Sequence, residues 1–298
     1  MTWSLASSPS QQGRIAIVTG SNVGLGYDTA LALAGKGWDV VLACRNLDKA
    51  KAAKSQILAR HPKSQIECSI LDLSSLKSVR SFAKVFVKEH KTLDLLINNA
   101  GIMMPPYALS EDGFESQMAA NYFGHFALTG LLLPLITNTP GSRIVSLSSL
   151  AHRWGTNTFD DIHSRSSYNK RLAYGNSKLA CLMFAYELNR RLRDAGSRTM
   201  AVAAHPGVAA TNLAQHFPKL MAMFFPLVGQ SSAAGALPTL YAALGEDNEG
   251  GDFCGPSGWR QMRGTPAKVH SSRASRDETA AKKLWDLSER LTKVRFVF

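Results

Sequence analysis

The stretch Thr19-Gly20-Ser21-Asn22-Val23-Gly24-Leu25-Gly26 decides the fold of this chain. It follows residues 14–18, RIAIV, an apolar segment rich in β-branched residues that predicts a strand. It leads into residues 27–33, YDTALAL, which predict a helix. Glycines let the chain turn tightly, and a helix N-terminus presents free N–H groups, so this combination forms a backbone cradle for phosphate. We therefore expect a dinucleotide to contact Gly20, Ser21, Asn22, Gly24, Leu25 and Gly26.

Strand and helix signals alternate along the rest of the chain. The apolar runs at 15–19, 39–44, 65–71, 93–98, 143–148 and 199–205 predict strands, and the segments 24–35, 47–60, 74–90, 113–135 and 170–193 predict helices. Short buried strands separated by helices indicate a parallel sheet covered on both faces. We expect one α/β domain over residues 1–298, a doubly wound Rossmann-type fold. A flexible tail at 1–12, a small C-terminal substrate lid at about 209–240 and a C-terminal helix at about 278–294 complete this prediction.

Composition narrows the class of protein. The chain is 45% hydrophobic and 19% charged, and the sequence shows no apolar run of the ~18–20 residues that a membrane helix needs. Residues 1–12 lack the pattern of a signal peptide. The four cysteines are far apart and form no CxxC motif, which favours a reduced protein in the cytoplasm. Neither the cysteines nor the histidines have metal-ligand spacing, so we expect no metal site.

The net charge of +12 raises the question of a nucleic-acid partner. The basic residues are scattered, and no recognition motif accompanies them. We therefore expect a soluble basic surface and no nucleic-acid partner. An excess of cations also suits a phosphate-rich cofactor.

Further motifs follow the glycine-rich turn in a fixed order. They are NNAG at 98–101, SLSS at 146–149, YGNSK at 174–178, and HPGV at 205–208 followed by Thr211. With these motifs the chain resembles the short-chain dehydrogenase/reductase family over roughly residues 14–211. The segments LACRN at 42–46, NNAGIMMP at 98–105, NYFGHF at 121–126, SSLAHR at 148–153 and KLWDLS at 283–288 are similar to the retinol-dehydrogenase-like branch.

The resemblance implies catalysis by a tyrosine and a lysine. Tyr174 and Lys178 are four residues apart on a predicted helix and so share a face. An ammonium one turn away stabilises the phenolate form, which lets Tyr174 act as general acid for reduction and general base for oxidation. The alternative is a tyrosine packed between helices beside a solvated lysine.

Ser149 and Asn121 complete the catalytic set that the resemblance implies. Ser149 donates a hydrogen bond to the substrate oxygen, with Ser148 as the competing choice. Asn121 supports a proton-relay water near Lys178. A mid-helix Asn in an apolar stretch is costly unless its amide is satisfied, which supports such a role, although a capping or kink residue is an alternative.

The residues after the second predicted strand indicate which of the two nicotinamide cofactors, NAD or NADP, the chain prefers. An acidic side chain there binds the ribose 2′-hydroxyl of NAD, but this chain has Arg45 followed by Asn46. An arginine binds a 2′-phosphate through bidentate, charge-assisted hydrogen bonds. We therefore predict that the cofactor is NADP(H).

The resemblance assigns the rest of the cofactor site. It places Asp72 and Leu73 at the adenine, although Asp72 also fits a helix cap. The ribose and nicotinamide contacts are Asn99, Ala100, Gly101, Tyr174, Lys178, Pro206, Gly207, Val208 and Thr211.

The segment 213–228 is rich in Phe, Met and Leu. Such side chains suit a bulky apolar ligand. Packing against a partner subunit and shallow membrane contact are the two alternatives. We expect four further apolar side chains in the wall of the substrate site: Met103, Met104, Tyr107 and Trp154.

These inferences converge on an oxidoreductase that interconverts a lipophilic aldehyde or ketone and its alcohol with NADP(H). Protochlorophyllide-reductase-like photoreduction is one alternative, and a non-catalytic NADP(H)-sensing protein on the same fold is the other. In the family, the helices that carry Asn121 and Tyr174 often pair between subunits. Their broad apolar faces predict a homodimer or homotetramer here.

Overall fold

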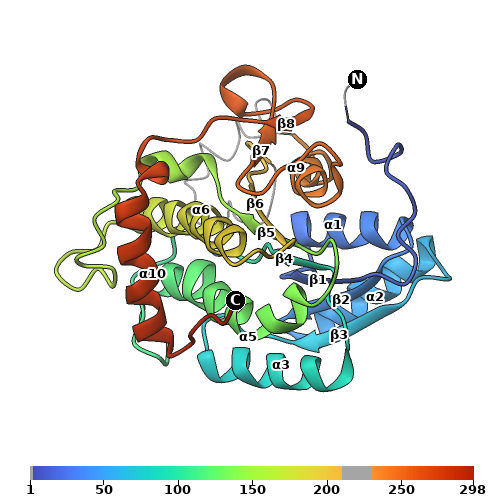
Figure 1. Cartoon of the computed structure of the whole chain (residues 1–298), viewed down its shortest axis with the longest axis horizontal. Helices are drawn as coiled ribbons and strands as arrows, with labels where there is room; N and C mark the ends of the chain where they lie inside the picture. The colour runs from blue at the N-terminus through green and yellow to red at the C-terminus, as the bar shows by residue number, and fades with distance from the viewer. Residues whose placement is uncertain (1–2, 210–229) are drawn as a thin grey trace.

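The computed structural model describes residues 3–209 and 230–298, and within them eight strands form one sheet (Figure 1). The strand order is β3-β2-β1-β4-β5-β6-β7-β8. All neighbours pair in parallel except β7 and β8, which are antiparallel. The strands are β1 (Ile15–Thr19), β2 (Asp39–Cys44), β3 (Ile66–Ile70), β4 (Leu95–Asn98), β5 (Arg143–Leu147), β6 (Met200–Ala204), β7 (Phe253–Pro256) and β8 (Pro266–Lys268).

The position of β1 in this order fixes where a ligand can bind. The chain runs outward from β1 to β3 and then returns to the other side of β1 with β4. The connections after β1 and β4 therefore leave in opposite directions at the carboxyl edge of the sheet. Open α/β sheets bind ligands at such a switch point, and the glycine-rich turn after β1 lies there.

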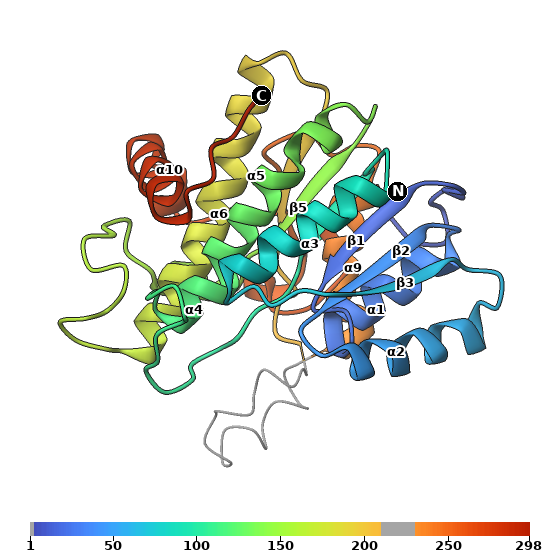
Figure 2. The same ribbon diagram turned by 90° about the horizontal axis from the view of Figure 1, so that it is seen from below.

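Helices cover both faces of the sheet (Figures 1 and 2). Helices α1 (Gly24–Gly35), α2 (Leu47–Arg60) and α9 (Ser232–Leu244) pack on one face. Helices α3 (Leu76–Glu89), α5 (Gly124–Thr137) and α6 (Lys170–Asp194) pack on the other. The predicted doubly wound α/β fold is confirmed.

The helix predicted at 113–135 is built from three segments. It starts with α4 (Ser116–Met118), continues as the π-helix η1 (Ala119–Phe123) and ends with α5. This continuous segment, 116–137, is the one stretch of the described residues that is long and apolar enough to cross a membrane, which the sequence prediction had missed. Its most apolar window has a mean hydropathy of 1.3 and is 78% buried inside the protein, as expected of a core helix.

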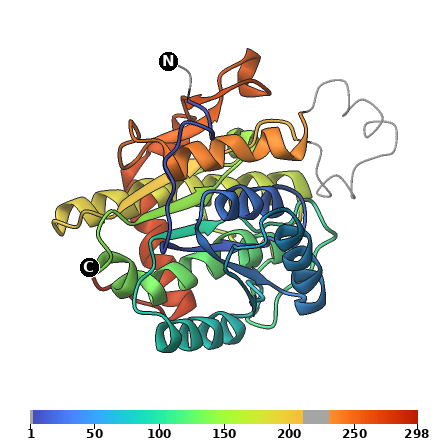
Figure 3. The ribbon, with the colours of Figure 1, turned by 90° about the vertical axis from the view of Figure 1, so that its right-hand side faces the viewer.

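The C-terminal region differs from the prediction of a lid at 209–240. Residues 210–229 lie outside the described part of the chain, but α9 begins at Ser232 and belongs to the layered core. Figure 3 shows α9 running beside α1. A β-carbon added at Gly235 would lie 2.9 Å from Leu25 Cδ2 of α1. The lid prediction was therefore wrong for the residues of α9.

Residues 3–8, part of the tail predicted to be flexible, contact the folded domain. The ring of Trp3 lies 5.4 Å from that of Tyr241 on α9. Lys36 Nζ donates hydrogen bonds to the carbonyl oxygens of Ala6 and Ser8. An aromatic contact and a lysine that binds two carbonyls hold residues 3–8 on the domain, and the sequence pattern carried no sign of either.

The final helix, α10 (Glu278–Thr292), crosses the face formed by α5 and α6 (Figure 1). Its Trp285 is 1% exposed and packs on Phe126 of α5 and Phe184 of α6. Phe296 of the following tail covers the same two rings. The apolar faces that had suggested a subunit interface are thus buried within the chain itself.

Candidate active site

The glycine-rich turn leaves bare backbone at the end of β1. Gly20 has a φ of +64°, and a β-carbon there would lie 2.9 Å from Ala100 Cβ. A β-carbon at Gly26 would lie 2.5 Å from Gly20 O. The N-cap of α1, Val23, makes no side-chain cap, so the first N–H groups of this helix stay available to an anion. The turn therefore fits the pyrophosphate of a dinucleotide.

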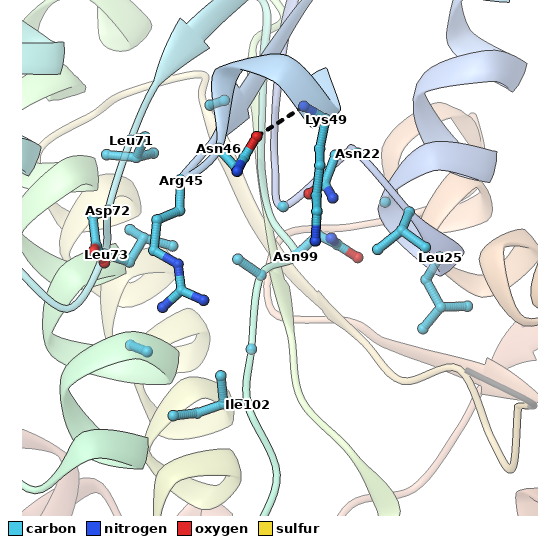
Figure 4. Close-up of a pocket in the computed structure, with 18 of the residues that line it drawn as sticks. Asn22, Leu25, Arg45, Asn46, Lys49, Leu71, Asp72, Leu73, Asn99 and Ile102 are labelled. Carbon is cyan, nitrogen blue, oxygen red and sulfur yellow. Dashed lines mark hydrogen bonds between the residues drawn. The ribbon is translucent and has the colours of Figure 1, made fainter. Parts of the chain in front are cut away.

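A cavity of about 420 Å³ opens beside this turn (Figure 4). It is lined by segments that follow β1, β2, β3 and β4. The predicted cofactor residues that line it are Gly20, Asn22, Gly24, Leu25, Gly26, Arg45, Asn46, Asp72, Leu73, Asn99, Ala100 and Gly101.

Ser21 differs from its neighbours in the turn. Its hydroxyl donates to Val18 O at 2.8 Å and lies 3.6 Å from Cys44 Sγ, and the residue is fully buried. The side chain joins β1 to β2 and points away from the cavity. Because the hydroxyl is used within the protein, only the backbone of Ser21 is left for the predicted contact with the cofactor, which stays a prediction.

Several lining residues were not predicted as cofactor contacts, although Met103 was predicted for the substrate wall. Lys49 is the most informative of them, because it adds a second cation to the lining that holds Arg45 (Figure 4). Its spacing of four residues from Arg45, in the first turn of α2, was a signal in the sequence. The others are Val23, Ala43, Leu71, Ile102, Met103 and Ala120.

The charges of this cavity are mostly positive. Arg45 and Lys49 form no ion pair with any described residue. Asn46 caps α2 by accepting a hydrogen bond from Lys49 N at 2.9 Å. The carboxylate of Asp72 accepts hydrogen bonds from the backbone N and the hydroxyl of Ser74. Asp72 thus both caps the turn before α3 and lines the cavity. Within the described residues, the two cations remain available to an anionic ligand.

Tyr174 and Lys178 lie one turn apart on α6, and both are buried. Lys178 Nζ donates to Leu147 O of β5 at 3.1 Å. A β-carbon at Gly101 would lie 3.2 Å from Lys178 Nζ, so the ammonium reaches the segment that follows β4. Tyr174 packs against Met104 and Ala151, and its hydroxyl has no hydrogen-bond partner among the described residues. This hydroxyl is therefore available to a substrate.

The structure separates the two candidate serines. The hydroxyl of Ser148 is buried and donates to Lys178 O at 2.7 Å, so it serves to anchor α6. Ser149 is the N-cap of the short helix η2 (Leu150–Trp154), and its hydroxyl accepts from Ala151 N at 3.2 Å. Its proton remains free to be donated. This difference favours Ser149 over Ser148 as the group that polarises a substrate oxygen.

A close contact fixes Ser149 and Tyr174 relative to each other. A β-carbon added at Gly175 would lie 2.9 Å from Gly155 N, which directly follows η2. The backbones of α6 and of the end of η2 therefore touch without side chains between them. This contact holds the segment that carries Ser149 against the helix that carries Tyr174.

Asn121 lies in the π-helix η1, where its amide is fully satisfied. Its Oδ1 accepts from Ile102 N at 2.8 Å, and its Nδ2 donates to Ile102 O and to Ser177 Oγ. π-bulges often occur at functional sites. The side chain holds the segment after Gly101 against α6, so a structural role for Asn121 is visible in the contacts. Its support of a relay water stays a prediction.

The predicted nicotinamide segment follows β6. Gly207 has a φ of +66°, and Val208 N donates to Met262 O at 2.8 Å. Gln230 Nε2 donates to Pro206 O at 2.8 Å. Pro206, Gly207 and Val208 do not line the described cavity, and Thr211 and the apolar segment 213–228 lie outside the described residues.

Comparison with known proteins agrees with this geometry. The family model for short chain dehydrogenases matches residues 14–220. Retinol dehydrogenase 13 of Homo sapiens is 41% identical over 288 residues, covering 94% of this chain and 84% of that protein. Retinol dehydrogenase 12 of Mus musculus is 40% identical over 279 residues, covering 93% of this chain and 85% of that protein.

Solved structures show the same architecture. A protein of Mycobacterium paratuberculosis is 42% identical, and its structure superimposes with a TM-score of 0.83 over 100% of both chains. A short chain dehydrogenase of Shigella flexneri 2a, solved with NADP, is 24% identical and has a TM-score of 0.66 over 83% of this chain and 98% of that chain. The second likeness shows the fold alone. The chain described here belongs to the short-chain dehydrogenase/reductase family of oxidoreductases, in its retinol-dehydrogenase-like branch.

Proposed function

We propose that this protein reduces a lipophilic aldehyde or ketone with NADPH, or oxidises the corresponding alcohol with NADP⁺. The observation that carries the cofactor choice is the pair of cations, Arg45 and Lys49, which line the cavity beyond β2 and form no ion pair within residues 3–209 and 230–298. A 2′-phosphate there satisfies both charges. A cavity built for NAD would carry a carboxylate at this position.

The chemistry follows from the residues around Tyr174. When bound, the cofactor supplies the hydride. Ser149 donates a hydrogen bond to the substrate oxygen, and Tyr174 gives that oxygen its proton in the direction of reduction. The Lys178 ammonium lies one turn from Tyr174 and stabilises the phenolate left behind.

The walls beside Tyr174 support an apolar substrate. Met103 and Met104 pack with Ala151 around the ring of Tyr174. Flexible methionines adapt to bulky apolar ligands. The curated relatives reported above are named retinol dehydrogenases, so retinal is a suitable probe of this substrate class. The four cysteines are free thiols, in keeping with the cytoplasm that we propose as the compartment.

The substitution Arg45→Asp tests the cofactor choice. We expect the wild-type protein to prefer NADPH over NADH in kcat/KM with decanal or retinal as substrate. In the variant the preference moves toward NADH by at least about tenfold, because a carboxylate repels the 2′-phosphate and accepts a ribose hydroxyl. An unchanged ratio of NADPH to NADH activity would refute the assignment of Arg45.

A further inference from the structure

The buried histidine His152 has no part in the chemistry above, yet it touches Ser149. Its side chain is 0% exposed and lies in η2, three residues after Ser149. Its Nδ1 lies 2.6 Å from Ser149 O, and its Nε2 accepts a hydrogen bond from Ser272 N at 3.1 Å. Ser272 lies 120 residues further along the chain.

These two contacts define the tautomer of the ring. A backbone N–H only donates, so Nε2 must accept from Ser272 and carries no proton. A carbonyl oxygen only accepts, so Nδ1 carries the proton and donates it to Ser149 O. Burial lowers the pKa of His152, which keeps the ring neutral and allows both hydrogen bonds.

The surroundings of His152 fix its position. The ring of Phe253, on β7, meets it edge-on at 5.6 Å. Ser272 is itself held, because Ser275 Oγ donates to Ser272 O at 2.6 Å and lies 2.9 Å from Ser271 Oγ. Ser271 Oγ in turn lies 2.9 Å from the hydroxyl of Tyr186 on α6. The ring is thus set between a rigid segment after β8 and the backbone of Ser149.

We propose that His152 is a positioning residue for the catalytic reaction, which fixes the backbone of Ser149 so that its hydroxyl faces the substrate oxygen. This inference rests on the proposed function, in which Ser149 polarises that oxygen. A change in the backbone torsion ψ of Ser149 would turn its hydroxyl relative to Ala151 N. The hydrogen bond from His152 Nδ1 opposes that change, together with the backbone hydrogen bond that His152 N donates to the same oxygen at 3.0 Å. It also makes the segment 269–276, which lies outside the dinucleotide-binding strands and helices, part of the support of the site.

Two substitutions of His152 test its two side-chain hydrogen bonds one at a time, because each keeps one bond and removes the other. The amide of Asn in His152→Asn occupies the place of Nδ1 and can still donate to Ser149 O, but it does not reach Ser272. The longer amide in His152→Gln occupies the place of Nε2, so it can accept from Ser272 N and loses the donor to Ser149. Both variants lose burial of the same ring, and the Tm of each shows how far their stabilities differ.

The test measures kcat and KM with NADPH and decanal, together with the Kd for NADPH and the Tm. We expect kcat to fall at least about tenfold in His152→Gln and to stay within about threefold of wild type in His152→Asn, with the Kd for NADPH unchanged in both. Equal kcat values in the two variants would overturn the proposal.

The variant Ser149→Ala, measured in parallel, separates this proposal from the proposed function. If Ser149→Ala keeps full activity, the role of Ser149 fails and with it the basis for His152. If Ser149→Ala loses activity while His152→Gln keeps it, only the positioning role fails.

A measurement on the wild-type protein keeps the proposal testable where a variant does not fold. Imidazole ¹⁵N NMR spectra report which ring nitrogen carries the proton. We expect two neutral, Nδ1-protonated signals at pH 7, because Nδ1 of the buried His125 also faces a backbone carbonyl, Asn121 O at 2.9 Å. The variant His125→Gln removes one of them and leaves the signal of His152. If no Nδ1-protonated signal remains in His125→Gln, the proposal is overturned.

Discussion

Lys49 shows how a single residue adds to the cofactor site. Its ammonium enters the cavity from the first turn of α2, one turn after Arg45, with the cap Asn46 between them (Figure 4). Two cations in the lining of one cavity attract a doubly charged phosphate more strongly than they attract a neutral ribose hydroxyl.

We therefore expect Lys49→Ala to weaken NADPH binding about three- to tenfold and to leave NADH binding unchanged. Fluorescence titration of each cofactor gives both Kd values. Lys51→Ala is the matched control, because Lys51 is an exposed lysine of the same helix that does not line the cavity. Equal losses for the two cofactors, or for the two lysines, would contradict a specific role of Lys49.

Most residues that line the cavity could be predicted from the sequence, because each motif directly follows a strand that ends at the same edge of the sheet. Sequence reasoning did not show that the Ser21 hydroxyl turns inward to Val18 O, since a motif does not reveal the direction of its side chains. It also missed His152, whose partner Ser272 is distant in sequence. Such a pairing exists only in the folded chain.

Among the elements, the strands up to β6 could be predicted because all of them except β3 (IECSI) are largely apolar runs between helices. The strands β7 and β8 could not. β7 is the segment FCGP, whose Gly and Pro are unfavourable in a strand, and it is held by its pairing with β6 and β8. The helix α9 was read as part of a lid because its packing on α1 leaves no local signal.

The helix α10 supports a prediction of its own. Trp285 fills the space between α5 and α6, and Trp→Ala substitutions in a core cost about 3–5 kcal/mol. We expect Trp285→Ala to lower the free energy of unfolding by this amount, as measured by urea titration. We also expect self-association of the variant in sedimentation, because the apolar faces of α5 and α6 become less covered.

Trp259→Ala is the control for this substitution. Trp259 is 68% exposed and lies over the guanidinium of Arg260, away from the core. Its removal is expected to change neither stability nor association. If Trp285→Ala unfolds at the same urea concentration as Trp259→Ala, then α10 does not stabilise the domain as described.

For the whole molecule, buried histidines determine how folding stability depends on pH. Desolvation by burial is the main cause that lowers the pKa of His125 to about 4 and that of His205 to about 3. In the unfolded chain histidine titrates near 6.5. Below that pH the unfolded state binds more protons than the folded state, so stability falls as the pH falls from about 6.5 toward 4.

For His125 alone, protonation of the unfolded chain lowers the free energy of unfolding by about 3 kcal/mol when the pH falls from 7 to 4. We expect urea midpoints to decrease steadily between pH 7 and pH 5. His125→Gln is expected to reduce this slope, and His270→Gln, which removes an exposed side chain, is expected to leave it unchanged. A stability that does not vary between pH 7 and pH 5 would show that these rings are accessible to protons in the folded protein.

The arrangement of the whole chain removes one argument for a homodimer or homotetramer, which stays a prediction. The apolar faces of α5 and α6 suggested a homodimer or homotetramer, but α10 and Phe296 cover them within one chain. Composition alone does not tell whether an apolar helix face is covered by the same chain or by another. The contacts that decide this point join residues more than a hundred positions apart.

The most direct test of the account is NADPH oxidation in the dark, with decanal and retinal as substrates, by the wild-type protein and by Tyr174→Phe. We expect turnover by the wild type and a loss of at least about 10²-fold in kcat for the variant, with the Kd for NADPH unchanged. Equal turnover by both proteins, or tight NADPH binding without dark turnover by either, would contradict it.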